Sequence, residues 1–93
     1  MPIQVNVPGA LQAFAGGSRR LQVDVRCRTV RDTLRAVAGV HPGVVERVLT
    51  ETGELREHVN VFVGEENCRF AGGLDAPVRD GAVLEIVASV SGG

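Results

Sequence analysis

The residues whose types and spacing could do chemistry are the last three of the sequence, Ser91-Gly92-Gly93. Glycine has no Cβ, so a carboxylate on Gly93 can thread a narrow slot and meet a reagent without steric hindrance. A C-terminal carboxylate is ionised at neutral pH. It is a competent nucleophile toward the α-phosphate of ATP, but a poor acyl electrophile until it is adenylated. Extended, residues 88–93 would reach roughly 20 Å beyond a folded body, far enough to enter the active site of another protein.

A second interpretation of Gly92-Gly93 is an ordinary frayed terminus, because chain ends are commonly small, polar and disordered. The dipeptide alone does not separate a reactive tail from an inert one. The rest of the sequence must therefore help to choose between the two interpretations, and we begin with its composition.

The composition indicates one small domain. The 93 residues leave no room for a second domain, and the net charge of −1 gives no signature of a nucleic-acid or membrane-surface partner. No apolar run approaches the ~20 residues of a membrane span, and the first residues lack a basic leader followed by an apolar stretch. We therefore expect a cytoplasmic protein. Cys27 and Cys68, with only His41 and His58 to assist them, do not predict a metal site.

All 10 basic residues are Arg, and the sequence contains no Lys. A genomic bias toward Arg codons explains this composition. A functional interpretation also stands, because a chemically activated carboxylate can acylate nearby amines. Arginine stays protonated in proteins and is inert to such a reagent, whereas lysine can become a nucleophile.

Alternating apolar and polar residues predict the strands of a sheet. The predicted strands are residues 3–7, 21–25, 59–63 and 82–87, with a short one at 68–70. Turns are expected at Pro8-Gly9, Gly16-Gly17 and Asp80-Gly81, and the first two strands are expected to pair as a hairpin. Leu11 and Phe14 are expected to be apolar plugs in the segment between these two strands.

The main helix is predicted to begin at Thr29, whose hydroxyl can cap the backbone amide of Asp32 in the manner of a capping box. An apolar stripe follows at helical spacing, formed by Val30, Leu34, Val37 and Ala38. Gly39 is the expected stop, and residues 42–49 indicate a short second helical segment. The order of elements predicts an α+β fold with one main helix packed across a mixed sheet, in which a parallel strand pair is permitted.

A docking surface is predicted on the side of the sheet away from that helix. Phe62 lies at an outward position of its strand, and Val83 and Val87 share the outward parity of the last strand. If these strands are neighbours, the three side chains form an exposed apolar patch with Arg69 near its rim. Exposed apolar patches mark binding sites, and an aromatic residue beside an arginine is typical of interface hot spots. The alternative is that Phe62 is an isolated surface residue without function.

The chain resembles the ubiquitin-like β-grasp sulfur carriers over nearly its whole length. These carriers include the small subunit of molybdopterin synthase, the thiamine-pathway sulfur carrier and the carrier of the thiocarboxylate-dependent cysteine pathway. The resemblance rests on Gly16-Gly17, Thr29-Val30, Val59-Asn60-Val61-Phe62-Val63, Arg69-Phe70-Ala71-Gly72-Gly73-Leu74, Asp80-Gly81 and Ser91-Gly92-Gly93, in that order. The stretch from Arg69 to Leu74 is most similar to the cysteine-pathway branch.

The resemblance implies a β-grasp domain over residues 1–87 and a flexible tail over residues 88–93. It also implies that an E1-like adenylating enzyme of the MoeB/ThiF type uses ATP and Mg to activate Gly93, while Ser91 and Gly92 thread its channel. A rhodanese-type donor or a sulfide source then makes a thiocarboxylate, and an acceptor biosynthetic enzyme receives the tail. The carrier itself would have no catalytic residue, no permanently bound cofactor and no metal.

Two other functions remain open at this point. A ubiquitin-like modifier would use the same tail and activation step, but would be conjugated through Gly93 to lysines of target proteins. A plain β-grasp interaction domain would have an inert tail. An autonomous enzyme is disfavoured, because the sequence shows no nucleophile–base pair, metal cluster or phosphate loop of the usual spacing. The sulfur acceptor also stays open between cysteine precursors, molybdopterin, thiazoles and thio-sugars.

Overall fold

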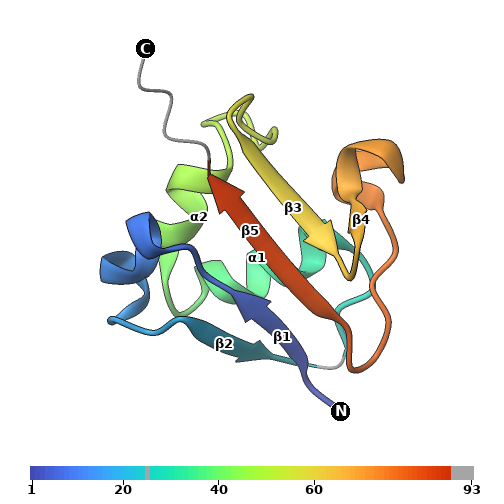
Figure 1. Ribbon diagram of the computed structural model, residues 1–93, viewed down its shortest axis with the longest axis horizontal. Helices are drawn as coiled ribbons and strands as arrows, with labels where there is room; N and C mark the ends of the chain where they lie inside the picture. The colour runs from blue at the N-terminus through green and yellow to red at the C-terminus, as the bar shows by residue number, and fades with distance from the viewer. Residues whose placement is uncertain (25, 89–93) are drawn as a thin grey trace.

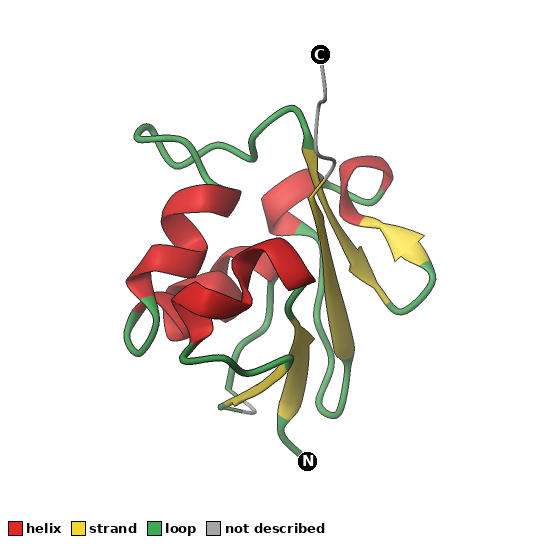
Figure 2. Cartoon of the chain, turned by 60° about the vertical axis from the view of Figure 1, so that its left-hand side comes forward, coloured by secondary structure: helices red, strands yellow, loops and turns green. Residues whose placement is uncertain are grey.

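The computed structural model describes residues 1–24 and 26–88, and these form a five-stranded mixed sheet with helices against one face (Figures 1 and 2). The strands are β1 (Ile3–Asn6), β2 (Arg20–Val23), β3 (Val59–Val63), β4 (Glu66–Asn67) and β5 (Val83–Ala88). The helices are α1 (Val30–Ala38) and α2 (Pro42–Val48), with 3-10 turns η1 (Gly9–Ala15), η2 (Cys68–Phe70) and η3 (Gly73–Asp75). The predicted α+β class is confirmed.

The last strand, β5, lies at the centre of the sheet, whose order is β2-β1-β5-β3-β4. It runs parallel to β1, where Val5 is opposite Leu84, and antiparallel to β3, where Val61 is opposite Ile86. β1 and β2 form the predicted antiparallel hairpin. Because β5 is parallel to β1, its C-terminal end points away from the N-terminus, as Figure 1 shows. The chain beyond Ala88 therefore continues from the middle strand of the sheet.

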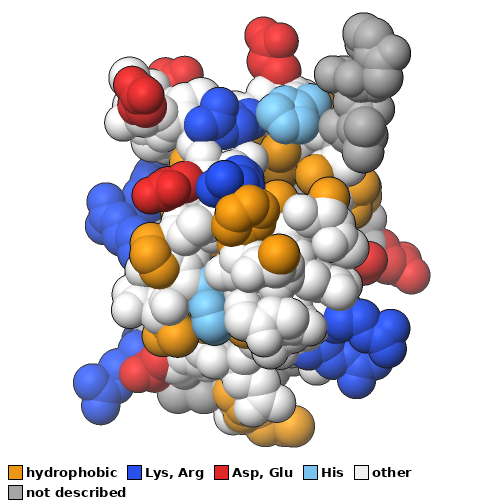
Figure 3. Space-filling view, turned by 90° about the vertical axis from the view of Figure 1, so that its left-hand side faces the viewer, with side chains coloured by type: hydrophobic (Ala, Val, Ile, Leu, Met, Phe, Trp, Pro, Cys, Tyr) orange, Lys and Arg blue, Asp and Glu red, His pale blue; other side chains and the backbone are white. Residues whose placement is uncertain are grey.

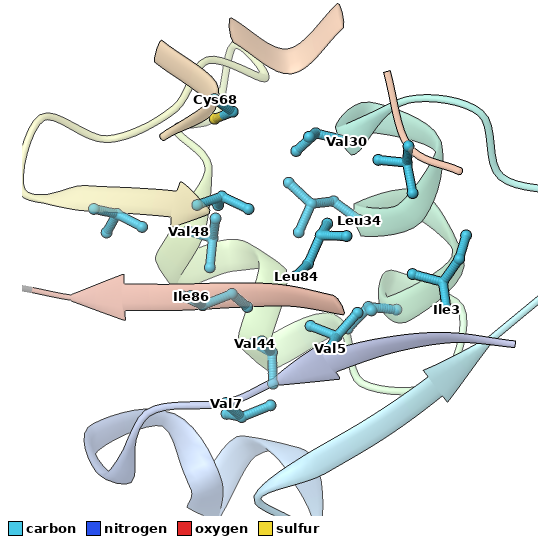
Figure 4. Packing of buried hydrophobic residues seen from close by; sticks show 14 of the residues in the cluster. Ile3, Val5, Val7, Val30, Leu34, Val44, Val48, Cys68, Leu84 and Ile86 are labelled. Carbon is cyan, nitrogen blue, oxygen red and sulfur yellow. The ribbon is translucent and has the colours of Figure 1, made fainter. Parts of the chain in front are cut away.

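The core lies between the inner face of the sheet and the helices (Figure 4). The alternation predicted from the sequence places Ile3, Val5, Val59, Val61, Leu84 and Ile86 in this core, all at most 2% exposed. From α1 the stripe contributes Val30, Leu34 and Val37, and α2 adds Val44 and Val48. Burying an aliphatic side chain of this size stabilises a protein by about 1.5–3 kcal/mol, so side-chain burial on the sheet's inner face fixes which residues remain outside.

The start of α1 is fixed by the predicted cap. The backbone N–H of Asp32 donates to Thr29 Oγ1 at 3.1 Å. In a capping box the Asp32 carboxylate would accept a hydrogen bond from the backbone N–H of Thr29. Here it accepts from the backbone N–H of Arg28 instead, at 3.1 Å. Gly39 ends α1 as expected, yet with a right-handed φ of −65°, so no left-handed turn is involved.

Replacing Thr29 by Ala is expected to lower the free energy of unfolding by about 1 kcal/mol, because the Asp32 amide loses its acceptor. Urea unfolding monitored by circular dichroism measures this change. Thr52→Ala is the matched control, since Thr52 is exposed in the loop before β3 and caps no helix. An equal loss in both variants would contradict the capping role of Thr29.

Two local predictions are wrong. Residues 68–70 form the 3-10 turn η2 instead of a strand, and the short strand is β4, just before it. The side chain of Asn67 is the cause, because its Oδ1 accepts from the backbone N–H of Arg69 at 3.0 Å and caps the turn. Phe14 is 38% exposed instead of plugging the core, and the guanidinium of Arg47 lies 3.5 Å from its ring centroid. Leu11 is buried as expected.

Candidate functional site

The root of the C-terminal tail is Ala88, the last residue of β5, which the structure pairs with Val59 of β3. Ala88, the first residue of the predicted tail, is therefore part of the sheet. Ser91, Gly92 and Gly93, the predicted reactive and threading residues, lie outside the described residues. The site that can be built from the structure is thus the surface around the root of the tail.

The side of the sheet opposite the helices, which we call the outer face, carries the predicted docking residues. Its members on the three central strands are Gln4, Asn6, Asn60, Phe62, Val83, Glu85 and Val87. Val83 and Val87 are 40% and 39% exposed, and Phe62 is half-buried. The structure therefore places Phe62, Val83 and Val87 on one face of adjoining strands, where the sequence predicts them.

The apolar side chains of the outer face surround a carboxylate. Glu85 lies directly opposite Phe62 in the register and stands between Val83 and Val87 on β5. On the other side, β1 presents two amides, with Gln4 Nε2 donating to Asn6 Oδ1 at 2.7 Å. A partner that covers this face must accommodate apolar groups around one exposed negative charge, which favours a surface carrying a basic residue among apolar ones.

Arg69 lies beside the outer face, where the sequence places it, but its guanidinium is engaged within the chain. Its Nε donates to Asn60 Oδ1 at 2.9 Å, and its Nη2 donates to the carbonyl oxygens of Arg56 at 2.6 Å and Val59 at 2.7 Å. Asn60 is opposite Val87 in the register, so this cluster adjoins the docking residues. The side chain most suited to a charged contact is thus already committed to backbone and amide acceptors.

The sequence reasoning missed Phe70 as a surface residue because it assigned residues 68–70 to a strand. Its side chain is 85% exposed on η2, next to Arg69, while the neighbouring Cys68 is fully buried. The signal that could have found it is the Asn67 cap, since asparagine favours turns over strand interiors. An exposed aromatic ring next to Arg69 enlarges the surface that a partner can contact.

The two thiols are unsuited to carrying sulfur. Burial raises the pKa of the Cys68 thiol, an effect that a hydrogen bond with the Val61 backbone and the nearby charge of Arg69 offset only in part. Burial also raises the pKa of Cys27, and the carboxylate of Asp32 raises it further. Both thiols are buried in the structure. A thiol with a raised pKa and little exposure holds little of the nucleophilic thiolate at neutral pH.

Alkylation of Cys27 and Cys68 by iodoacetamide at neutral pH is expected to be at least about tenfold slower than alkylation of glutathione, because both thiolates are suppressed. The rate should rise steadily with pH and become fast in denaturant. Intact mass spectrometry over time measures it. Rapid modification of either residue in the folded protein would instead identify a reactive thiol.

No group of three or more His, Cys, Asp or Glu side chains within residues 1–24 and 26–88 could hold a metal ion. A hollow of about 240 Å³ lies at the root of the tail, between Val7-Pro8 and residues 85–88. Basic and acidic side chains are interspersed on the face shown in Figure 3. Among the described helices, none is long and apolar enough to span a bilayer.

The sequence is similar to a family of known proteins and to individual members of it. The model of the ThiS family matches residues 5–93. The chain is 31% identical over 99 residues to the sulfur carrier protein CysO of Mycobacterium tuberculosis, covering 100% of both chains. It is 39% identical over 82 residues to small archaeal modifier protein 1 of Haloferax volcanii, covering 87% of this chain and 90% of that protein.

Solved structures extend the similarity to three dimensions. A chain of the Amycolatopsis orientalis BexX/CysO complex superimposes with a TM-score of 0.89 at 34% identity, covering 98% of this chain and 99% of that chain. The predicted ubiquitin-like β-grasp fold is confirmed by this match together with the mixed sheet.

Proposed function

The chain belongs to the ThiS family, and from this premise we propose that it is a sulfur carrier protein whose Gly93 carboxylate is converted to a thiocarboxylate. The observation that supports the proposal is the placement of Ala88, the root of the tail. The diglycine follows a central strand that ends at Ala88, directly beside an exposed face with apolar residues. This arrangement lets one partner hold the folded body and receive the tail at the same time.

The proposed chemistry takes place on the tail and uses the active site of the partner. The Gly93 carboxylate attacks the α-phosphate of ATP, pyrophosphate leaves, and an acyl-adenylate forms. A sulfur donor, either sulfide or a rhodanese-type persulfide, then attacks the acyl carbon and displaces AMP. With a persulfide donor, the remaining sulfur–sulfur bond must be cleaved by a thiol to release the thiocarboxylate. The E1-like partner binds ATP and Mg, so this chain is a substrate and not an enzyme.

The outer face is the proposed docking surface for the adenylating enzyme. Val83 and Val87 stay about two-fifths exposed although they belong to the central strand. Glu85 between them supplies a charge that a basic residue of the partner can pair with. Because the root of the tail is the next residue after Val87, binding of this face places Gly93 near the partner's active site.

The thiocarboxylate is proposed to supply sulfur to a biosynthetic enzyme of the cytoplasm. Similarity to proteins named CysO favours cysteine formation as the pathway. A thiocarboxylate is ionised and nucleophilic at neutral pH, so it can attack an activated carbon on a small molecule in the acceptor's pocket. The pocket of that acceptor, not the carrier, selects the molecule that receives sulfur.

A second candidate function is conjugation to lysines through Gly93, which the similarity to small archaeal modifier protein 1 favours. Both functions begin with the same acyl-adenylate, and they differ in whether sulfur or an amine displaces AMP. Cell extracts separate them, because a modifier leaves amide-linked adducts that survive strong thiols and hydroxylamine.

The proposed activation is tested by ATP–pyrophosphate exchange with the E1-like adenylating enzyme of the source organism. Exchange should depend on this chain and saturate with its concentration, because pyrophosphate re-forms ATP only from the acyl-adenylate. Addition of sulfide should then release AMP in step with carrier consumption. No exchange by an enzyme that activates another diglycine carrier would refute the proposed activation.

A further inference from the structure

Two arginines hold the turn that precedes β3. The guanidinium of Arg69 reaches this turn from η2 and donates to the carbonyl oxygens of Arg56 and Val59, while its Nε donates to Asn60 Oδ1. The amide of Asn67 donates to the same Asn60 oxygen at 3.2 Å. Three hydrogen bonds thus tie η2 and β4 to the start of β3, and a fourth ties η2 to Arg56 in the turn before it.

The other side of the turn is held by Arg56. Its Nη2 and Nε donate to the carbonyl oxygen of Glu46 in α2 at 2.9 and 3.3 Å, and its backbone N–H donates to the carbonyl of Val48 at 3.0 Å. The backbone N–H of Val59 closes the turn by donating to the Arg56 carbonyl at 3.0 Å. The segment from Arg56 to Asn60 is therefore fastened between α2 and η2.

This fastened segment is the neighbour of the tail's root. Val59 is opposite Ala88, and Asn60 is opposite Val87, in the antiparallel ladder between β3 and β5. Beyond Glu85 the register with β1 ends, so in the described part of the sheet β3 alone pairs with the last residues of β5. The position of Ala88 depends on how firmly the start of β3 is held.

We propose that Arg69 is a positioning residue for activation of the tail: it holds the start of β3, and through it Ala88, in a fixed place relative to the outer face. This inference rests on the proposed function. The five residues after Ala88 span at most roughly 17 Å, so the position of Ala88 sets the region that the Gly93 carboxylate can reach. A shift of the root by an ångström or more then lowers the rate at which Gly93 attains its reactive position.

The geometry distinguishes this role from a charged contact at the rim of a docking surface. The planar guanidinium donates to three acceptors from two nitrogens, Nε and Nη2, and the single nitrogen of lysine does not reproduce this fixed geometry. Lysine keeps the positive charge and would serve a partner's carboxylate nearly as well. Arg69→Lys therefore separates positioning from electrostatic docking, and Arg69→Met removes both.

The test measures kcat and KM for carrier in ATP–pyrophosphate exchange, with Arg79→Met as the matched control. Arg79 is exposed near Asp80 and makes no side-chain hydrogen bond or ion pair among those seen in residues 1–24 and 26–88. Both Arg69 variants are expected to lower kcat about tenfold and leave KM within about twofold, whereas Arg79→Met stays at the wild-type values. Amide hydrogen exchange should quicken over residues 56–60 and 86–88 in the two Arg69 variants only.

Three results would overturn the role of Arg69. These are wild-type kcat in Arg69→Lys, an effect confined to KM, and unchanged amide exchange over both segments. Absence of exchange activity with the wild-type carrier would count against the proposed function instead. Amide hydrogen exchange still tests in that case whether Arg69 holds the start of β3 in place, because this measurement needs no partner enzyme.

Discussion

Deletion of Gly93 is expected to abolish carrier-dependent ATP–pyrophosphate exchange while leaving the folded domain intact. The deletion moves the carboxylate back by one residue, so it no longer reaches the α-phosphate of ATP held by the partner. Gly93→Val keeps the length but adds a branched side chain on the Cα next to the reacting carboxylate, and should lower kcat/KM by about 100-fold. The buried core of the described residues is formed between Ile3 and Ile86, so we expect the free energy of unfolding to stay within about 0.5 kcal/mol of the wild type.

Ser91→Ala is the matched control for these tail variants. It alters the same segment without adding bulk, so activation should be retained. Steady-state exchange assays and urea unfolding on the same preparations separate a chemical defect from a folding defect. Full exchange activity in the Gly93 deletion would contradict the assignment of the reactive group to this residue.

The second large effect is expected on the outer face. Val87→Asp places a second carboxylate two residues from Glu85, in a surface that the partner is proposed to cover with apolar groups. Burying an unpaired charge at the centre of an interface costs about 2 kcal/mol or more, so KM for the carrier should rise about 30-fold. At saturating carrier, kcat should change little, because the tail and its root are intact.

Val40→Asp is the control for the docking surface. Val40 is 72% exposed just after α1, away from the outer face, and receives the same change of side chain. Its KM is expected to equal that of the wild type. Equal defects in both variants would indicate a general effect of added charge, and a normal KM in Val87→Asp would remove β5 from the docking surface.

The strands and their buried faces could be predicted from the sequence, because the pattern that indicates them lies within a few neighbouring residues. An alternation such as Val83-Leu84-Glu85-Ile86-Val87 assigns each side chain to one of two faces, and the structure confirms that Leu84 and Ile86 are buried while Val83 and Val87 are exposed. Likewise, the start of α1 follows from the short-range pairing of Thr29 with Asp32. Both patterns depend on residues within a few positions of one another.

Features that depend on loop closure could not be predicted in the same way. The bonds of Arg69 to Arg56, Val59 and Asn60 join residues 9 to 13 positions apart, across the end of one strand and a turn. No periodicity in the sequence marks them, so Arg69 was expected to face a partner. The strand predicted at 68–70 failed for a related reason, because the side chain of Asn67 competes with the sheet for the backbone N–H of Arg69.

The central claim is that sulfur is carried on Gly93, and intact mass spectrometry tests it most directly. The protein is incubated with ATP, Mg, sulfide and its adenylating enzyme, and fragmentation then locates any change of mass. We expect replacement of one carboxylate oxygen by sulfur at Gly93, dependent on ATP and absent from the Gly93 deletion. An unchanged mass, with the enzyme active on another carrier, or amide-linked adducts in place of the thiocarboxylate, would contradict the claim.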